Sequence, residues 1–288
     1  MTPATFPHEA MATHFEVAIA GQAYDYAHQA AEAAFRELDR LETILSRYVE
    51  SSDIARANRS ARGATIAITH ETLECLMIAA DVSLATHRAF DPAYASDRPP
   101  ELAADLPPFT LDPAAHTLTS QADVLHLDLG AVGKGFALDR MADILRDWGI
   151  TSACLNAGGS SVLALETPPT PESRGWDVGL GEGRGRRVIS LLAASLSGSG
   201  IAVKGSHLID PRTGLPAVRT NRVWAYATDA AQADALSTAF FVMNEAEIAA
   251  LCTAHPQVGA ALAAPGEELI VHGALRALVA RARVGDGA

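Results

Sequence analysis

The chain has 288 residues, of which 49% are hydrophobic, so it is long and apolar enough to bury a sizeable core. Its 22 Lys and Arg residues against 34 Asp and Glu residues give a formal net charge of −12, which argues against nucleic acid or an anionic membrane as the main partner. An anionic ligand therefore needs a local set of hydrogen-bond donors or a metal ion.

The cysteines are odd in number and far apart, so Cys75, Cys154 and Cys252 indicate neither a disulfide framework nor a thiolate zinc site. We expect them to be small core residues rather than reactive thiols. No apolar run approaches the length of a membrane span, and the first residues, "MTPATFPHEAMATHFEV", show no basic segment that leads into an apolar one. The expected location is cytoplasmic as the chain stands, or periplasmic if a signal segment has been removed.

Hydrophobic periodicity predicts the elements of the first half of the chain. Residues 14–21 alternate like a strand, and residues 24–48 carry apolar side chains at helical spacing. Residues 64–69 predict a second strand, and Thr69 can cap the helix that follows. The predicted buried face of that helix consists of Leu73, Leu76, Met77, Ala80 and Leu84. Residues 90–113 are rich in Pro, Asp and Ala without a period, which predicts a long and functional loop.

The second half alternates strands with three helices. Residues 116–120 and 124–130 predict strands, and a helix follows from about Lys134 to a stop at Gly149. The stretch "SACLNAGGSSVLAL" predicts two strands that are broken at the glycine pair. Further strands are predicted at "WDVGL", "RRVISLLAAS", "RVWAYAT", "VGAALAA" and "EELIVHG", and further helices over 231–243 and 245–254. We therefore predict one α+β domain with extensive sheet, over residues 1–288.

A glycine-rich turn in "LDLGAVGKGFALDR" leads directly into the helix near Lys134. Free backbone N–H groups, the helix dipole and the lysine together suit a phosphate group. The spacing of Gly130, Gly133 and Gly135 matches neither GxxxxGK[ST] nor GxGxxG. A tight connection whose glycines allow positive φ explains this stretch equally well.

Asp234 and Thr238 are four residues apart, so on a helix they share one face. A carboxylate and a hydroxyl are hard oxygen ligands that suit Mg²⁺, which takes few protein ligands and completes its shell with water and substrate phosphates. Each residue also has a purely structural interpretation, because Asp near a helix start complements the dipole and Thr often bonds back to its own helix.

The stretch "GSHLIDPRTGLP" holds His207 and Asp210 beside a Pro-Arg-Thr-Gly turn. Asp before Pro often starts a turn, which is a structural role. A histidine in such a place can also orient or deprotonate a hydroxyl near neutral pH.

Seven stretches together resemble the FAD:protein FMN transferases, the ApbE-type flavin transferase family, and occur in that family's order. They are "MATHFEV", "LSRYVESSDIARANR", "AFDPAY", "DLGAVGKGFALDRMADILRDWG", "NAGG", "HLIDPRTGLP" and "ADALSTAFFV". The resemblance implies a single large domain with mainly antiparallel sheets flanked by helices, of the ApbE type and related to the T-fold. It also implies a Mg²⁺-dependent enzyme that transfers the FMN half of FAD to a Thr or Ser hydroxyl of an acceptor protein and releases AMP.

Residue by residue, the resemblance implies both halves of a site. The implied FAD-binding residues are Met11, Tyr48, Ala89, Phe90, Asp91, Asp128, Lys134 and Leu208. Met11 and Tyr48 match positions that contact the isoalloxazine ring. The implied metal ligands are the Ala131 carbonyl, Asp234 and Thr238, with Ser237 as an additional one.

For the acceptor hydroxyl, we expect His207 to activate or position it, with Asp210 as support. The implied partner is a flavoprotein with a Ser/Thr flavinylation motif, and no sequence feature specifies an oligomeric state. Only "IAVKG" separates "SLSGSG" from "SHLIDP", where the family usually has a longer hairpin. Two other functions therefore stay open: an FAD pyrophosphatase that gives FMN and AMP, and a non-catalytic FAD-binding protein.

Overall fold

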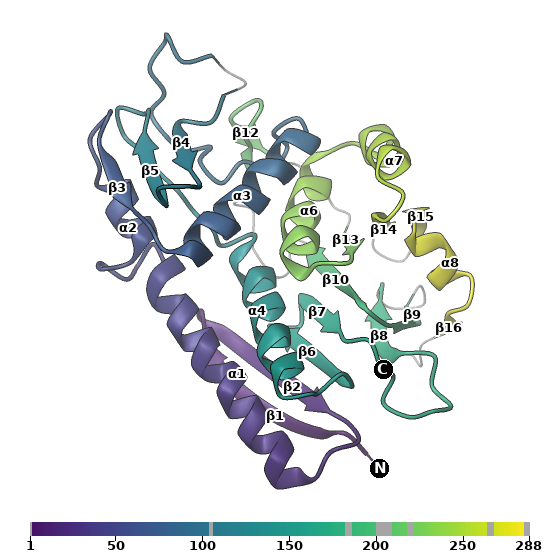
Figure 1. Ribbon diagram of the computed structural model, residues 1–288. Coiled ribbons are helices and arrows are strands. Elements are labelled where there is room, and N and C mark those ends of the chain that lie inside the picture. Colours follow the sequence, from purple (N-terminus) through teal and green to yellow (C-terminus); the bar gives the residue numbers. More distant parts are fainter. Residues whose placement is uncertain are drawn as a thin grey trace.

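An eight-stranded antiparallel sheet forms the centre of the fold (Figure 1). The computed structural model describes residues 2–103, 106–181, 186–199, 209–217, 222–263 and 268–284. In spatial order, the strands of the large sheet are β1 (Ala4–Ala10), β2 (Thr13–Ile19), β6 (Ala153–Ala157), β7 (Ser161–Ala164), β10 (Ala194–Ser199), β13 (Arg222–Ala227), β14 (Gly259–Ala263) and β15 (Ile270–Gly273). Side chains alternate between the two faces of such a sheet, so each face needs its own cover.

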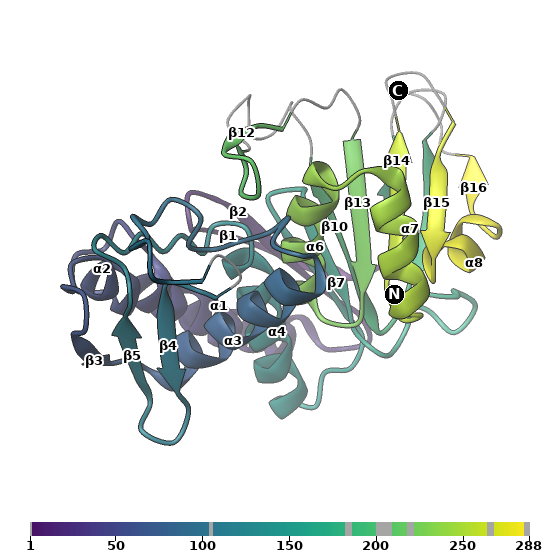
Figure 2. The same cartoon turned by 90° about the horizontal axis from the view of Figure 1, so that it is seen from above.

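Three neighbouring helices cover one face of this sheet (Figures 1 and 2). They are α1 (Tyr24–Leu45), α4 (Gly133–Asp147) and α6 (Ala230–Val242). Helix α4 lies between the other two, and α3 (His70–Ala85) packs against α6 from outside. Helix α7 (Glu245–Ala254) packs against β14 and β15. Among the helices of the described residues, none combines the length and the apolar character that crossing a membrane requires.

Smaller sheets complete the fold. On the other face of the large sheet, Trp176, Ile189 and Leu191 pack against Leu196 and Ala261 in a second core. The small sheets are β16–β9–β8 (Arg283–Val284, Arg187–Leu191, Trp176–Leu180), β3–β5–β4 (Thr65–Ala67, Thr117–Ser120, Phe109–Asp112) and the hairpin β11–β12 (Ile209–Asp210, Leu215–Pro216). Two short helices, α2 (Asp53–Asn58) and α8 (Leu275–Val279), complete the described elements.

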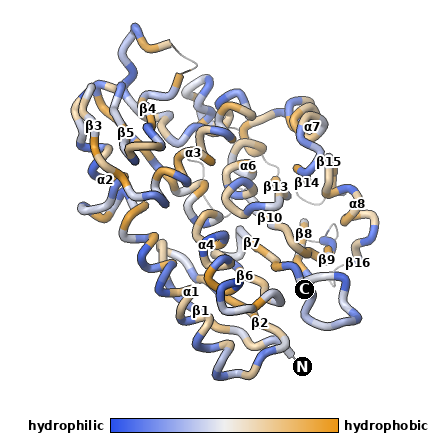
Figure 3. The backbone as a smooth tube through the Cα atoms, viewed as in Figure 1, coloured by the Kyte–Doolittle hydropathy of each residue, from blue (hydrophilic) through white to orange (hydrophobic). Residues whose placement is uncertain are grey.

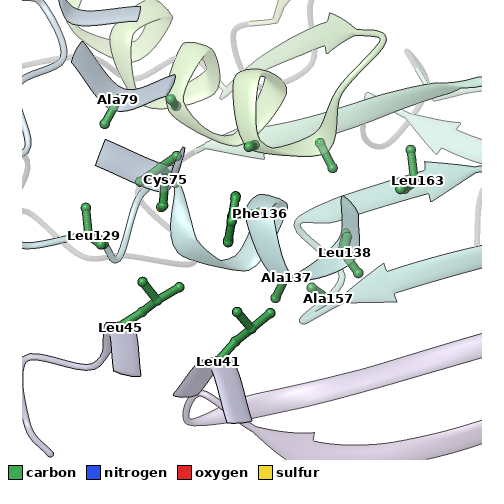
Figure 4. Packing of buried hydrophobic residues seen from close by; sticks show 14 of the residues in the cluster. Leu41, Leu45, Cys75, Ala79, Leu129, Phe136, Ala137, Leu138, Ala157 and Leu163 are labelled. Carbon is green, nitrogen blue, oxygen red and sulfur yellow. The ribbon is translucent and has the colours of Figure 1, made fainter. Parts of the chain in front are cut away.

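The main core lies between the helices and the sheet. The apolar residues of the helices gather on the sides that face this core, as the hydropathy colours show (Figure 3). Leu41 of α1, Phe136 and Leu138 of α4 and Cys75 of α3 meet there (Figure 4). Full burial of a large apolar side chain stabilises a fold by roughly 1.5–3 kcal/mol, so this core fixes α4 relative to its neighbours.

The α+β prediction with mainly antiparallel sheets is confirmed, since the strand pairings are antiparallel. The Thr69 cap is confirmed as well, because its side chain accepts a hydrogen bond from the Thr72 N–H. Cys75 and Cys252 are buried, as expected of core residues, whereas Cys154 is only partly buried and packs against the second core; burial raises the pKa of Cys154 to about 12.

Four details were predicted wrongly, the first being the buried face of α3. Met77 is 43% exposed and Leu84 is 78% exposed, whereas Cys75 and Ala79 are buried. The helix is turned because the Thr72 hydroxyl donates to the buried Asp53 carboxylate, which draws the Thr72 side inward.

The second wrong prediction is a strand over residues 124–130, where the structure shows only an isolated bridge at Val124. Asn58 takes the place of a neighbouring strand here: its side chain donates to the Leu127 carbonyl (2.9 Å) and accepts from the Leu127 N–H (2.6 Å). The segment is therefore extended without belonging to a sheet.

The third and fourth wrong predictions concern the boundaries of strands. The long loop predicted over residues 90–113 contains strand β4, which pairs with β5. The strand predicted over 186–195 is two strands, β9 and β10, because the chain turns at Ala193 with φ of 47°.

Candidate active site

Two adjoining pockets lie where α1, the α4 N-terminus and the β11–β12 hairpin come together. The first has a volume of about 410 Å³ and the second about 250 Å³. Both are lined by Asp128 and Gly130, so they meet at the turn that precedes α4. Met11, Tyr48 and Lys134 line the first pocket, which we call the ring pocket. Ala131 and Thr238 line the second, which we call the phosphate pocket.

Aromatic and charged groups shape the ring pocket. The Arg47 guanidinium lies 4.7 Å from the centre of the Tyr48 ring, and its Nη2 donates to the Tyr48 hydroxyl (2.6 Å). Its Nη1 is 3.4 Å from Asp128 Oδ2. Met11 occupies the tight β1–β2 turn, where both it and Ala12 have positive φ. The pocket therefore offers a thioether, an aromatic ring and a paired cation to a planar ligand.

The segment before α4 directs polar groups at both pockets. Asp128 Oδ1 accepts the Gly130 N–H (2.9 Å), which closes the turn. Helix α4 begins at Gly133, so its first N–H groups and the positive end of its dipole lie at this turn. Gly133 and Lys134 both line the ring pocket. This end of the site is suited to an anion, as the sequence predicts.

Asp234 is the most enclosed charged group of the site, with 2% of its surface exposed. Lys134 Nζ lies 3.1 Å from its Oδ2 and 3.3 Å from its Oδ1. The Gly135 N–H donates to Oδ2 (3.2 Å), and the Ser161 hydroxyl donates to Oδ1 (3.2 Å). A buried carboxylate requires such donors, because a buried charge without partners is strongly unfavourable.

Three groups at this end of the site carry oxygens of the kind that a hard divalent cation binds. The Thr238 hydroxyl is buried and has no hydrogen-bond partner among the described residues. The Gly135 N–H, which a regular helix directs at the carbonyl of residue 131, donates to Asp234 instead. With the Asp234 carboxylate, these groups form the type of oxygen set that Mg²⁺ takes. The described residues contain no cluster of three or more His, Cys, Asp or Glu side chains suited to a metal.

The Ser237 hydroxyl is already engaged within the fold. It donates to the Asp234 carbonyl (2.8 Å) and lies 2.9 Å from the Ser199 hydroxyl. Its proposed role as an additional metal ligand remains a prediction.

The loop of Ala89, Phe90 and Asp91 forms one wall of the phosphate pocket. Asp91 is 8% exposed, and its Oδ1 accepts the Ala93 N–H (2.8 Å). Its Oδ2 accepts from Arg88 Nε (3.1 Å). The Asp91 carboxylate thus fixes its own loop at the edge of the pocket.

Asp139 holds the start of α6 against α4. Its two oxygens accept the N–H groups of Ala230 and Ala231, both at 2.8 Å. Burial, together with the nearby negative charges of Asp229 and Asp143, raises the pKa of Asp139 to about 7 despite these hydrogen bonds. Asp234 lies one turn further along α6, so this contact helps to place it.

The β11–β12 hairpin borders the phosphate pocket through Ile209 and Pro211. Asp210 accepts from Arg212 Nε (3.0 Å), and Arg212 also donates to Glu247 (2.8 Å). Burial alone would raise the pKa of Asp210, but the hydrogen bonds and charge of Arg212 lower it overall. His207 and Leu208 lie outside the described residues, so the predicted contact between His207 and Asp210 remains a prediction.

The structure gathers most of the residues that the sequence singles out. Those that line the two pockets are Met11, Tyr48, Ala89, Phe90, Asp91, Asp128, Ala131, Lys134 and Thr238. Sequence reasoning missed Arg47, Asp139 and Ser161. Arg47 directly precedes Tyr48, which is the one local signal available, while the other two act only through the packing of α6.

Known proteins that are similar to this chain point to one family. Residues 11–262 match the ApbE family. An FAD:protein FMN transferase from Treponema pallidum is 31% identical over 175 residues, which cover 54% of this chain and 48% of that protein. One from Klebsiella pneumoniae is 23% identical over 251 residues, which cover 75% of this chain and 77% of that protein. The aligned stretch thus spans about half of the first relative.

Solved structures show the same fold. A mutant of the flavin transferase ApbE from Vibrio cholerae has a TM-score of 0.81 at 19% identity, and the match covers 96% of this chain and 100% of that chain. The ApbE protein from Thermotoga maritima has a TM-score of 0.79 at 22% identity, with 96% and 99% covered. The fold therefore agrees with the match of residues 11–262, and the chain belongs to the ApbE family.

Proposed function

We propose that this chain is a Mg²⁺-dependent FAD:protein FMN transferase. An acceptor Ser or Thr hydroxyl oxygen forms a bond to the FMN-side phosphorus of FAD, and the bond from that phosphorus to the AMP oxygen breaks. The products are a protein with FMN in phosphodiester linkage, AMP, and the proton that the hydroxyl loses. The names of the relatives support the flavin substrate and the transfer.

The observation that carries this proposal is the buried Thr238 hydroxyl, which has no hydrogen-bond partner in the described part of the chain and lies one helical turn from the buried Asp234 carboxylate. Together with the Ala131 carbonyl, these groups would hold Mg²⁺, which would neutralise the pyrophosphate and make its phosphorus more electrophilic. The adjoining ring pocket has the size and lining for a flavin ring. A site that joins a ring pocket to a divalent-cation site fits a dinucleotide such as FAD.

The chain's own groups have distinct roles in this proposal. Lys134 and the α4 N-terminus stabilise negative charge on the phosphates, because one carries a positive charge and the other the positive end of the helix dipole. Tyr48 and Met11 hold the isoalloxazine ring, and Arg47 keeps Tyr48 and Asp128 in place. His207 positions or deprotonates the acceptor hydroxyl, a role that a histidine side chain can perform near neutral pH. Positioning is the main contribution in phosphoryl-type transfer.

The test uses the full chain with FAD, Mg²⁺ and an acceptor peptide that carries a Ser/Thr flavinylation motif. AMP release and the acceptor's mass are followed together, for wild type, Asp234→Ala and the surface control Asp143→Ala. We expect one FMN per acceptor with wild type and the control, and none with Asp234→Ala. AMP with free FMN and an unmodified acceptor would instead establish a pyrophosphatase, and bound FAD without AMP would establish a non-catalytic binder.

A further inference from the structure

Ser161 approaches the Asp234 carboxylate from the sheet beneath α6. It is the first residue of β7, directly after the turn that contains Gly158 and Gly159. Its surface is 0% exposed, and its Oγ lies 3.2 Å from Asp234 Oδ1. The two residues are 73 positions apart in the chain, so this contact exists only because α6 lies over the sheet.

Within the residues that the structure describes, the Ser161 hydroxyl donates to Asp234 alone. Ser197 lies opposite Ser161 in the β7–β10 register, yet its own hydroxyl has no hydrogen-bond partner within the described part of the chain. The two serines therefore do not satisfy each other. The Ser161 proton points to Asp234, where a charged acceptor makes the hydrogen bond stronger than a neutral one.

The donors to Asp234 differ in how firmly they are held. Ser161 is mounted on a strand that is paired on both sides, with β6 and with β10. The Gly135 N–H belongs to the backbone of α4. Lys134 reaches Asp234 through a long, flexible side chain, and in the proposed function it also contacts the substrate phosphates. The plane of the carboxylate is therefore set by Ser161 on Oδ1 and Gly135 on Oδ2.

We propose that Ser161 is a positioning residue for Asp234: its hydroxyl holds the carboxylate in the orientation in which it would bind the divalent cation. This inference rests on the proposed function, in which Asp234 is a metal ligand. Groups that hydrogen-bond to metal ligands fix their orientation, and their removal commonly weakens metal binding by about 10- to 100-fold.

The experiment measures Mn²⁺ binding to the full chain without FAD, by the loss of the free-ion electron paramagnetic resonance signal. Mn²⁺ is the probe because it takes the same oxygen ligands as Mg²⁺. The variants are Ser161→Ala, which lacks the hydroxyl, and Ser161→Cys, which fills the same space with a weak donor. Ser195→Ala is the matched control, because Ser195 is also 0% exposed but donates to the Val162 carbonyl (2.8 Å), away from Asp234.

We expect both Ser161 variants to bind Mn²⁺ at least about tenfold more weakly than wild type, and Ser195→Ala to bind it as wild type does. Thermal unfolding of each variant identifies the folded samples, and the cysteine variant replaces the alanine variant if the latter does not fold. The transfer reaction of the Ser161 variants gives a second readout. The Mg²⁺ concentration that gives half the maximal rate should increase by a larger factor than the rate at saturating Mg²⁺ decreases.

Two results overturn the inference while leaving the proposed function intact. If Ser161→Ala binds Mn²⁺ as tightly as wild type does, Ser161 has no positioning role. If Ser161→Ala binds Mn²⁺ weakly but Ser161→Cys binds it as wild type does, the side chain at this position only fills space. If wild type binds no Mn²⁺ either without FAD or with FAD present, the metal site of the proposed function is wrong, and the role of Ser161 is overturned with it.

Discussion

Lys134, which lines the ring pocket, forms an ion pair with the buried Asp234, with Nζ 3.1 Å from Oδ2 and 3.3 Å from Oδ1. Both side chains are well shielded, with 16% and 3% of their surfaces exposed. Lys134 thus uses the same carboxylate oxygens that a metal ion would take. In the proposed function, the lysine and the metal would therefore compete for Asp234, and a substrate phosphate that draws Lys134 away would favour the metal.

Replacing Lys134 by Met should change metal binding and stability in opposite directions. The variant leaves a buried carboxylate without its cation, so we expect the free energy of unfolding to fall by about 3 kcal/mol without metal. Mg²⁺ should bind the variant more tightly in the absence of FAD, because neither competition nor repulsion opposes it. Titration calorimetry and the Mg²⁺-induced rise in melting temperature measure this, with Arg140→Met on the same helix as the control. Equal Mg²⁺ affinity in wild type and Lys134→Met would contradict the competition.

Thr238→Val should lower the affinity for Mg²⁺ without lowering the stability of the metal-free protein. The Thr238 hydroxyl is buried without a partner among the described residues, so its removal without metal should leave stability unchanged or raise it by about 1 kcal/mol. Mg²⁺ affinity should fall, because an oxygen ligand is lost. Ser237→Ala should behave differently, since that hydroxyl is hydrogen-bonded and its loss costs stability. A marked loss of stability without metal in Thr238→Val would show that the hydroxyl is satisfied in the fold.

Gly135→Ala should destabilise the protein by forcing α4 and α6 apart. A Cβ at position 135 would lie 2.1 Å from the Ala230 carbonyl oxygen, a contact that only a backbone shift can relieve. We expect a loss of about 3 kcal/mol in the free energy of unfolding, as for severe overpacking. Gly133→Ala is the matched control on the same helix, because a Cβ there meets nothing closer than 3.9 Å. Chemical denaturation of the two variants gives the comparison, and equal stability would mean that the two helices can move apart freely.

Asp139 should make stability depend on pH between about 4 and 7. Its pKa is raised from an ordinary 3.8 to about 7, so across this window the folded protein keeps a proton that the unfolded chain has released. The free energy of unfolding therefore falls as pH rises through the window, by up to about 4 kcal/mol. Asp139→Asn does not titrate, so the stability of wild type relative to this variant should decline from pH 4 to pH 7. A constant difference would show that the carboxyl is already ionised at pH 4.

The sequence predicted best what depends on local spacing. The apolar period after Lys134 gave α4, and the four-residue spacing of Asp234 and Thr238 placed both on α6. These features follow from the geometry of a single helix. Residues 124–130 failed because their pattern resembles a strand, while the partner that satisfies them is the side chain of Asn58.

The parts that could not be predicted depend on which segments meet in space. Ser161 follows the glycine pair in the sequence, and nothing nearby indicates that its hydroxyl faces Asp234. Likewise, the buried face of α3 is set by the contact of Thr72 with Asp53, 19 residues earlier. Periodicity indicates that a helix has an apolar side, but tertiary contacts determine which polar residues of the helix are buried together with that side.

The distance of 100 residues along the chain between Lys134 and Asp234 also bears on how the protein is made. When α4 emerges from the ribosome, α6 has not yet been synthesised. The growing chain then contains the glycine turn but not the Asp234 carboxylate and the Thr238 hydroxyl. Until α6 emerges, the side of α4 that presents Gly135 and Phe136 stays uncovered. Contacts of such long range form late and slowly, so the pair of Lys134 and Asp234 forms only once translation of the domain is nearly finished.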